Sequence, residues 1–240
     1  MSDTMQDGIR RVVGVFAHPD DPEILAGGTF ARWADEGAEI IFVMATSGDK
    51  GSSDPDMTPD QLVAIREEEE RRAAAALGVK DVIFLRYPDG ELEPSLDLRR
   101  DIVREIRRFK PDVLVTFDPS NWYSENRINH SDHRAIGEAA LAAAFPTARD
   151  RLNFLEMERD EGLSAHKTRF VYIANAINPN TSIDISDYVE TKIRSLREHK
   201  SQMGLSEGLA ERIRSRALDP HAPEGAPRYI ESFFVVTLRV

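Results

Sequence analysis

Short apolar runs alternate with longer amphipathic stretches along most of this 240-residue chain. The apolar runs are rich in Val, Ile and Phe, as buried strands are, and they cover residues 12–17, 39–46, 81–85, 112–117, 169–175 and 232–240. The stretches between them predict helices at 28–36, 58–77, 95–109, 133–145, 185–202 and 206–218. This alternation predicts an α/β fold with a Rossmann-like, mostly parallel sheet and helices on both faces.

The chain is long enough for one full-sized core, and α/β folds of this length often form a single domain. No internal repeat, low-complexity tract or domain-sized linker divides the sequence. We therefore expect one domain over residues 1–240, with a flexible N-terminus over residues 1–10.

Composition excludes several classes of function. The absence of cysteine removes disulfides, thiolate catalysis and sulfur ligands, so any metal site must use nitrogen and oxygen donors. A net charge of −11 argues against nucleic acid as the main partner. The apolar runs are far shorter than the roughly 20 residues that cross a bilayer. The first residues also lack the apolar segment of a signal peptide, so we expect no membrane span and a cytoplasmic location.

A dense polar cluster, His18-Pro19-Asp20-Asp21, directly follows the first predicted strand. Open parallel sheets bind ligands at the carboxyl ends of their strands, which is where this cluster falls. Neighbouring carboxylates in extended backbone point in different directions, so one can face a metal while the other does acid–base chemistry. In the simplest structural alternative, Asp21 only caps the helix that follows.

A second cluster, His130-Ser131-Asp132-His133, follows the fourth predicted strand, and the two clusters contain three of the six histidines. One histidine of this cluster can complete a set of metal ligands, the other can face substrate, and Asp132 can orient an imidazole. Two histidines and one carboxylate suit Zn²⁺, with Fe²⁺ and other divalent ions as alternatives. We predict that the two clusters meet in space and bind one metal ion.

Other segments allow weaker inferences. Two long loops, residues 47–57 and 118–129, leave the carboxyl ends of predicted strands and should border the same crevice. The acids and bases of residues 66–72 (REEEERR) predict a solvated helical face. Gly27 and Gly28 allow close backbone packing, but the phosphate-binding pattern GxGxxG is absent, so we expect no dinucleotide site there.

At these residues the chain resembles the PIG-L/LmbE-like de-N-acetylases, zinc-dependent amidohydrolases that act mainly on N-acetylglucosamine-containing substrates. The first family motif, AHPDD followed by GGT, stands at residues 17–21 and 27–29, and the second, HxDH, at residues 130–133. Similar segments also occur in the helix around Arg66 and in the sequences TSGDKG, YPDG and VTFDP, at 46–51, 87–90 and 115–119. The resemblance covers about residues 11–145.

The resemblance implies a Zn²⁺ ion held by His18, Asp21 and His133. Asp20 corresponds to the general base of the hydrolysis. A small amino-sugar substrate and a homo-oligomer, trimeric or hexameric, are also implied.

Further roles follow from the same resemblance. His130 matches the histidine that stabilises the tetrahedral intermediate or protonates the leaving amine, and Asp132 matches its orienting partner. Arg66 stands where relatives place an arginine on substrate hydroxyls, and Asp89 is a second candidate for contact with substrate.

Two positions depart from the family pattern. Ser131 replaces the usual proline, and Ile128 stands where some relatives carry an oxyanion-donating tyrosine. Tyr123 from the same loop is the candidate replacement. Together with Trp122 it can stack on a sugar ring, or instead anchor a loop or a subunit interface.

Two alternatives for the function stay open. One is an amidase that acts on a thiol conjugate of glucosaminyl inositol, and the other is a non-catalytic sugar-binding module. Asp20 counts against the module, because a binding protein needs no base beside its metal. The C-terminal third matches the family less specifically, and relatives vary their substrate pocket there.

Overall fold

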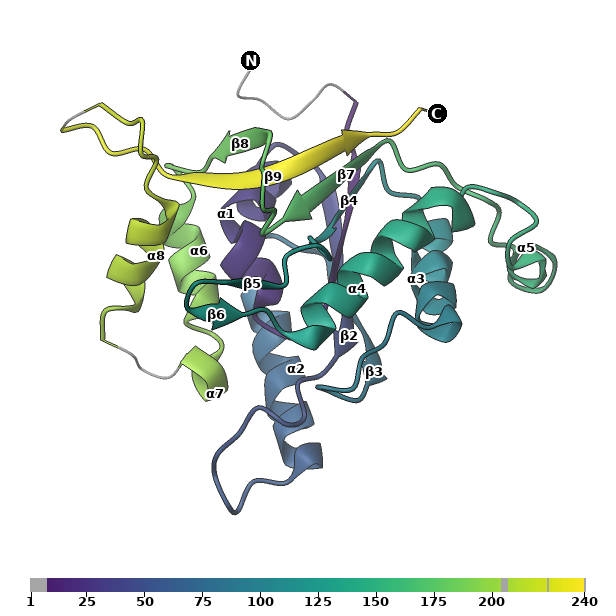
Figure 1. The fold of residues 1–240 in the computed structure, drawn as a ribbon, viewed down its shortest axis with the longest axis horizontal. Coiled ribbons are helices and arrows are strands. Elements are labelled where there is room, and N and C mark those ends of the chain that lie inside the picture. The colour runs from purple at the N-terminus through teal and green to yellow at the C-terminus, as the bar shows by residue number, and fades with distance from the viewer. Residues whose placement is uncertain (1–7, 204–206, 224, 240) are drawn as a thin grey trace.

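The computed structural model describes residues 8–203, 207–223 and 225–239, and a seven-stranded sheet lies at its centre (Figure 1). The strand order is β3-β2-β1-β4-β7-β9-β8. The strands are β1 (Arg11–Phe16), β2 (Glu39–Thr46), β3 (Asp81–Tyr87), β4 (Val113–Phe117), β7 (Phe170–Ala174), β8 (Thr181–Asp184) and β9 (Ile230–Thr237). Strands β1 to β4 and β7 run parallel, and β9 runs antiparallel to both β7 and β8. The predicted mostly parallel α/β sheet is confirmed.

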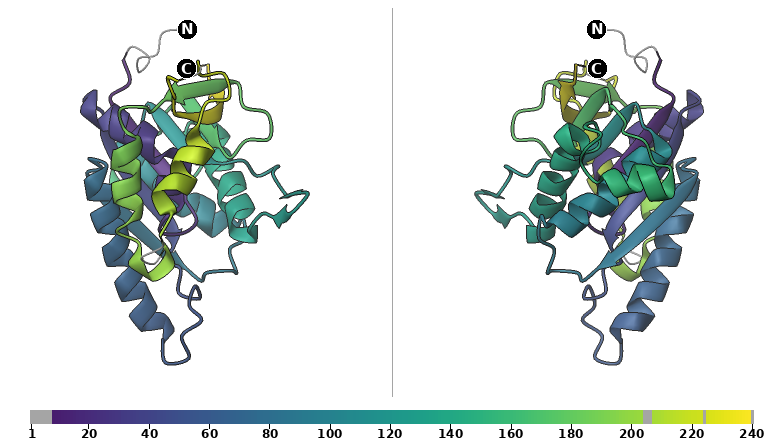
Figure 2. Two further views of the ribbon diagram at one scale, coloured as in Figure 1. Left: turned by 90° about the vertical axis from the view of Figure 1, so that its left-hand side faces the viewer. Right: turned by 90° about the vertical axis from the view of Figure 1, so that its right-hand side faces the viewer.

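Helices cover both faces of the sheet (Figure 1, Figure 2). On one face α1 (Asp21–Asp35) and α2 (Pro59–Ala76) pack against α6 (Val189–Leu196), and on the other lie α3 (Leu96–Phe109) and α4 (Ser131–Ala142). The remaining helical segments are a π-helical turn (Ala143–Thr147), α5 (Leu155–Glu161), α7 (Lys200–Met203) and α8 (Leu209–Ala217). No helix in these residue ranges is long and apolar enough to cross a membrane.

The centre of the core explains why the strand sequences are continuously apolar. Every residue of β4 is buried, and so are five of the six residues of β1, because helices cover both faces of these strands. Phe16 makes edge contacts with Phe30, Phe42 and Phe117, with ring centroids 5.8–6.3 Å apart.

Helix α1 begins seven residues earlier than the predicted start at residue 28, at Asp21. Pro22 in its first turn has the φ angle that a helix start requires. The helix is kinked at Ala26, where φ is −144°, and Gly28 just beyond the kink packs so closely on Ile185 that a Cβ atom there would lie 2.7 Å from its side chain. Close packing at Gly28 is thus confirmed, but it occurs inside the helix.

The prediction of a solvated face for residues 66–72 is wrong. Arg66, Glu67, Glu69 and Glu70 are buried, and only Glu68 and the two final arginines are exposed. The cause is long-range packing, because Ser47 donates to Glu67 and Ser201 donates to Glu69, at 2.8 and 2.6 Å. Segments distant in sequence cover this side of α2.

Several elements differ from the sequence-based boundaries. The helix predicted at 185–202 is divided into α6 and α7 by a turn that contains His199. Helix α5, strand β8 and the hairpin of β5 (Tyr123–Ser124) and β6 (Arg127–Ile128) were not predicted, and the hairpin projects to the side (Figure 2). Of the N-terminus predicted to be flexible, residues 1–7 lie outside the described residues, whereas Ile9 is buried.

A buried ion pair joins α1, α6 and β9. Glu231 accepts hydrogen bonds from the backbone N–H groups of Gly28 and Thr29 and, at 2.6 Å, from Lys192 Nζ. Both charged side chains are about 95% buried, with 5% and 4% exposed. Removing one partner leaves the other charge buried and uncompensated.

Lys192→Met is therefore expected to lower the free energy of unfolding by about 3–5 kcal/mol. Urea unfolding followed by circular dichroism measures this change. The control is Lys80→Met, which removes an exposed pair with Glu39 and is expected to cost at most about 1 kcal/mol. Equal effects of the two substitutions would contradict a structural role for the buried pair.

Candidate metal centre

The two polar clusters lie at the point where the strand order reverses. From β1 the chain proceeds outward to β2 and β3, and it returns to the other side of β1 at β4. The loops after β1 and β4 thus lie on either side of one crevice. Such a crevice is the usual ligand site of open α/β sheets. His18 follows β1, and His130 is the N-cap of α4 after the β4 loop. The structure brings both clusters together there.

His18, Asp21 and His133 form one group of metal-compatible donors. His18 Nδ1 lies 3.4 Å from Asp21 Oδ2, and His133 Nε2 lies 3.2 Å from Asp21 Oδ1. The three donor atoms of the group all lie within 4.8 Å of one another. Asp21 also accepts the His18 backbone N–H at 2.8 Å, whereas neither Asp20 nor Asp21 caps α1 through its side chain. Capping alone therefore does not explain this cluster.

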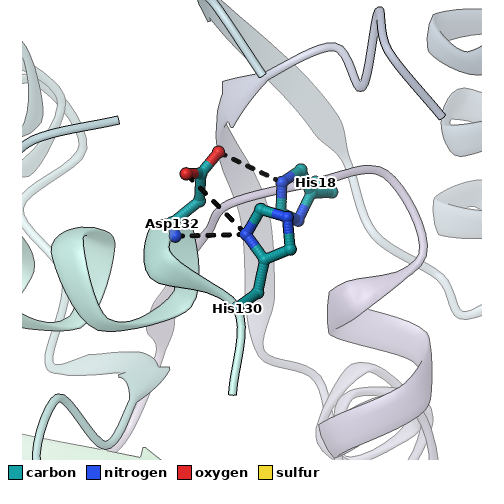
Figure 3. Close-up of side chains that lie close together, drawn as sticks. All are labelled: His18, His130 and Asp132. Atoms are coloured by element: carbon teal, nitrogen blue, oxygen red, sulfur yellow. Dashed lines mark hydrogen bonds and ion pairs between the residues drawn. The ribbon is translucent and has the colours of Figure 1, made fainter. Parts of the chain in front are cut away.

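The opposite nitrogen of each histidine in this group is held by a polar partner. His18 Nε2 lies 3.0 Å from Asp89 Oδ1 and 3.3 Å from Asp132 Oδ2, the latter contact drawn in Figure 3. His133 Nδ1 lies 3.1 Å from Asn129 Oδ1. Metal-binding histidines usually have such partners, which fix the tautomer and the ring orientation.

Aromatic packing restrains His133 further. Its ring stacks on Phe117, the last residue of β4, with centroids 4.1 Å apart and an angle of 12°. Close approach of α4 to β4 depends on Gly137, since a Cβ atom there would lie 2.6 Å from the Phe117 carbonyl oxygen. Asn129 is a site residue that no motif predicts, although its position four residues before His133, at a helix start, is a usable signal.

The electrostatics of this pocket favour a cation. Burial opposes the charged form of His18, but Asp132, Asp21 and Asp89 together raise the pKa of its imidazole to about 12. Burial likewise opposes ionisation of Asp21, yet His133 and His18 hold its pKa far below the ordinary value. The pKa of Asp89 falls to about 2 because His18 outweighs the effect of burial. Nitrogen and carboxylate donors in such a pocket fit a divalent metal ion.

His130 is oriented by the backbone of the helix that it caps. The Asp132 N–H donates to His130 Nδ1 at 3.1 Å, while the Asp132 carboxylate lies farther from that nitrogen, at 3.7 Å (Figure 3). Nδ1 therefore accepts, and a neutral His130 ring carries its proton on Nε2. Burial and the positive charge of His18 lower the pKa of His130, which favours this neutral form.

This tautomer also decides between two overlapping groups of donors. His18, His130 and Asp132 form the second group in which the donor atoms lie within 4.8 Å of one another. The Nδ1 lone pair of His130 is occupied by a backbone N–H, and the Asp132 carboxylate accepts from His18 and from the Gly90 N–H at 2.7 Å. The group of His18, Asp21 and His133 is thus the better candidate for a metal site.

Asp20 stands beside this group in an unusual backbone conformation. Its φ angle is 100°, in the left-handed region that residues other than glycine rarely adopt. The side chain is 15% exposed and lies 3.5 Å from Arg66 Nη2. Burial and the neighbouring Asp21 raise the pKa of Asp20 to about 7. This basicity suits a group that accepts a proton near neutral pH.

Arg66 lies beneath the loop that carries Asp20. Its guanidinium donates to the Pro19 carbonyl at 2.7 Å and to the Gly48 carbonyl at 3.1 Å, and the residue is 4% exposed. These contacts favour a positioning role for Arg66 over the expected contact with substrate hydroxyls.

The remaining substrate-binding candidates lie in different surroundings. Asp89 is buried against His18, and it also accepts the Lys50 N–H at 3.3 Å. Tyr123 is 77% exposed on the β5–β6 hairpin and, with Asn129, lines a small cavity of about 150 Å³. Trp122 is 58% exposed and contacts Arg134 of α4, whose guanidinium carbon lies 4.1 Å from the ring centroid.

Comparisons with known proteins agree with this geometry. A family model described as GlcNAc-PI de-N-acetylase (PIG-L) matches residues 13–144. A diacetylchitobiose deacetylase from Thermococcus kodakarensis is 34% identical over 198 residues, which cover 81% of this chain and 70% of that protein. A probable N-acetyl-alpha-D-glucosaminyl L-malate deacetylase 2 from Bacillus anthracis is 29% identical over 205 residues, covering 80% and 81%.

Solved structures include a similar fold. The N,N'-diacetylchitobiose deacetylase from Pyrococcus horikoshii superposes with a TM-score of 0.84 at 31% sequence identity. The match covers 96% of this chain and 85% of that one, so it includes the C-terminal third that the sequence motifs left unassigned.

Proposed function

Because the chain belongs to the PIG-L family of de-N-acetylases, we propose that it is a metal-dependent hydrolase that removes the acetyl group from an N-acetylglucosamine unit of a small substrate. One observation carries the proposal. Donor atoms of His18, Asp21 and His133, from segments more than a hundred residues apart in sequence, lie within 4.8 Å of one another, next to the mostly covered side chain of Asp20.

His18, Asp21 and His133 would hold the metal ion, and their donor types fit Zn²⁺, with Fe²⁺ as an alternative. When bound, the ion supplies Lewis-acid chemistry, since it polarises the amide carbonyl and lowers the pKa of water. Asp89 and Asp132 hold His18 from its other side and keep the site preorganised.

The proton chemistry belongs to Asp20. Its carboxylate accepts a proton from the attacking water, and the same proton then passes to the departing nitrogen as the C–N bond breaks. Water and an acetamide are consumed, and acetate and a free amine are formed. Arg66 holds the Asp20 loop through the Pro19 carbonyl, so Asp20 is positioned before substrate arrives.

His130 is the proposed stabiliser of the oxyanion. The backbone N–H of Asp132 occupies its Nδ1, so the proton on Nε2 is free to donate to the carbonyl oxygen as that atom gains charge. The lowered pKa of His130 supports this role over that of a general acid, because a neutral ring donates a hydrogen bond without giving up its proton.

The two alternative functions have less support. Several relatives are named for deacetylation of N-acetyl sugars, which supports deacetylation over cleavage of a thiol conjugate. A binding module needs no base, so the presence of Asp20 next to Asp21 counts against that alternative. The proposal also includes Zn²⁺ as the ion, a trimeric or hexameric assembly and a cytoplasmic location. These three parts follow from the family resemblance and the sequence.

Acetate release tests the function directly. Purified protein loaded with Zn²⁺ is incubated with N-acetylglucosamine, diacetylchitobiose and N-acetylglucosaminyl conjugates of inositol and malate, and acetate and free amine are quantified together. We expect equal amounts of both products from at least one substrate, loss of the activity with a chelator, and recovery when metal is restored. No release from the whole panel by metallated protein would favour the binding module.

Substitution of His130 tests the oxyanion assignment. An oxyanion donor contributes about 3 kcal/mol, so His130→Ala is expected to lower kcat by roughly a hundredfold with little change in KM. The matched control, His221→Ala, removes an exposed histidine outside the site and should retain full turnover. Near wild-type turnover of His130→Ala with metal bound would disprove the assignment.

A further inference from the structure

A second group of metal-compatible side chains lies next to the loop that carries Asp20. It shares no residue with the group of His18, Asp21 and His133. Glu23 of α1, Glu70 of α2 and His199 of the turn between α6 and α7 are each 0% exposed. One donor atom from each lies within 4.8 Å of the other two. Three segments that are distant in sequence thus direct their polar side chains to one interior point.

Hydrogen bonds do not account for these buried groups. Within the described residues, both ring nitrogens of His199 and both carboxylate oxygens of Glu23 have no hydrogen-bond partner. Glu70 uses one oxygen to accept the Asp20 N–H at 3.1 Å, and its other oxygen has no partner. Buried polar atoms are nearly always satisfied, because each one left unpaired costs about 1–3 kcal/mol.

The distances within the group are those of ligands that share an ion. His199 Nε2 lies 3.4 Å from Glu23 Oε2 and 3.7 Å from Glu70 Oε2. Both distances exceed the roughly 2.7–3.2 Å of an N–H···O hydrogen bond. Two ligands that are each about 2.1 Å from a tetrahedral zinc ion lie about 3.4 Å apart.

The charge of the group also favours a bound metal ion. Two carboxylates in the interior must either take up protons or lie beside a compensating positive charge. The nearby cations are engaged elsewhere: Lys192 Nζ bonds Glu231 and the Ile24 carbonyl, and Arg66 bonds two backbone carbonyls. A divalent ion would neutralise both carboxylates and take the imidazole as a neutral nitrogen donor.

We propose that Glu23, Glu70 and His199 bind a second, structural divalent metal ion, with Zn²⁺ the best match to the donor types. The ion joins α1, α2 and the α6–α7 turn. Through Glu70, which accepts the Asp20 N–H, it also fixes the backbone of the catalytic loop. The proposal does not depend on the reaction proposed above.

Metal content tests the proposal without an activity assay. The full chain is saturated with Zn²⁺, passed over a desalting column and measured by mass spectrometry of zinc against protein concentration. We expect two ions per chain in the wild type, one in His199→Gln and one in Asp21→Asn. The double variant should contain none, and the control His221→Gln should retain two.

Crystals of the zinc-saturated wild type provide a second readout that needs no variant. Anomalous diffraction at the zinc edge should give one peak among Glu23, Glu70 and His199 in addition to the peak at the first site. One ion per chain in both wild type and His199→Gln would overturn the proposal. A zinc peak at His18 and Asp21 with none at His199 would also overturn the proposal. Shared protons, and not a metal ion, would then hold Glu23, Glu70 and His199 together.

Discussion

Replacement of Asp20 with asparagine is expected to lower kcat by about 10³-fold while the metal content stays unchanged, because the substitution removes the proposed general base. Asparagine has nearly the same shape and tolerates the left-handed backbone conformation in which Asp20 is found, with φ of 100°. The fold and the loop should therefore persist. Acetate release at saturating substrate and zinc content by mass spectrometry measure the two quantities.

The control for this variant is Asp60→Asn, which changes an exposed carboxylate in the first turn of α2. It should leave both turnover and metal content at the wild-type level. Turnover of Asp20→Asn within a few-fold of the wild type would contradict the assignment of the base, and the proton would then have to leave through another group.

Asp21→Asn is expected to lose the ion of the catalytic site and to lower turnover by about 10³-fold or more, because the Lewis-acid chemistry leaves with it. The Asp21 carboxylate lies between the two histidines of the group, 3.4 Å from His18 Nδ1 and 3.2 Å from His133 Nε2. Asparagine can still accept the His18 backbone N–H, so local structure should survive while the negative charge is lost.

Comparison of Asp20→Asn with Asp21→Asn distinguishes the role of a base from the role of a metal ligand. They change adjacent carboxylates by the same chemistry, and both should be inactive. Only Asp21→Asn should lose one zinc ion per chain, and added Zn²⁺ should restore part of its turnover but none of that lost in Asp20→Asn. Full zinc content in Asp21→Asn would contradict its role as a ligand.

The meeting of the two motifs could be predicted from the sequence because parallel sheets have few topologies. An apolar run followed by His18 and Asp21 predicts a strand with ligands at its carboxyl end, and the same reasoning places His133 after a second strand. The β1–β4 pairing that brings them together follows from the reversal of strand order in such folds.

The start of α1 was harder to predict, although Pro22 signalled it. Gly27 and Gly28 suggested that the helix begins at residue 28, but the close packing of Gly28 on Ile185 occurs inside the helix. Local sequence does not reveal that neighbour, which lies more than 150 residues farther along the chain.

Burial of charged residues could not be predicted for the same reason. Local spacing in residues 66–72 favours a solvated helix face, whereas Glu70 is buried by the turn that carries His199. That turn lies in the part of the sequence with the least specific motifs. Likewise, sequence suggested that the Asp132 carboxylate orients His130, but the shorter contact comes from the Asp132 backbone N–H, which no sequence pattern specifies.

Anomalous diffraction from zinc-loaded crystals shows whether the segments after β1 and β4 hold one metal ion beside Asp20. We expect a zinc peak within about 2.0–2.2 Å of one donor atom each from His18, Asp21 and His133. Zinc found elsewhere in the crystal, with no peak among these three side chains, would contradict it.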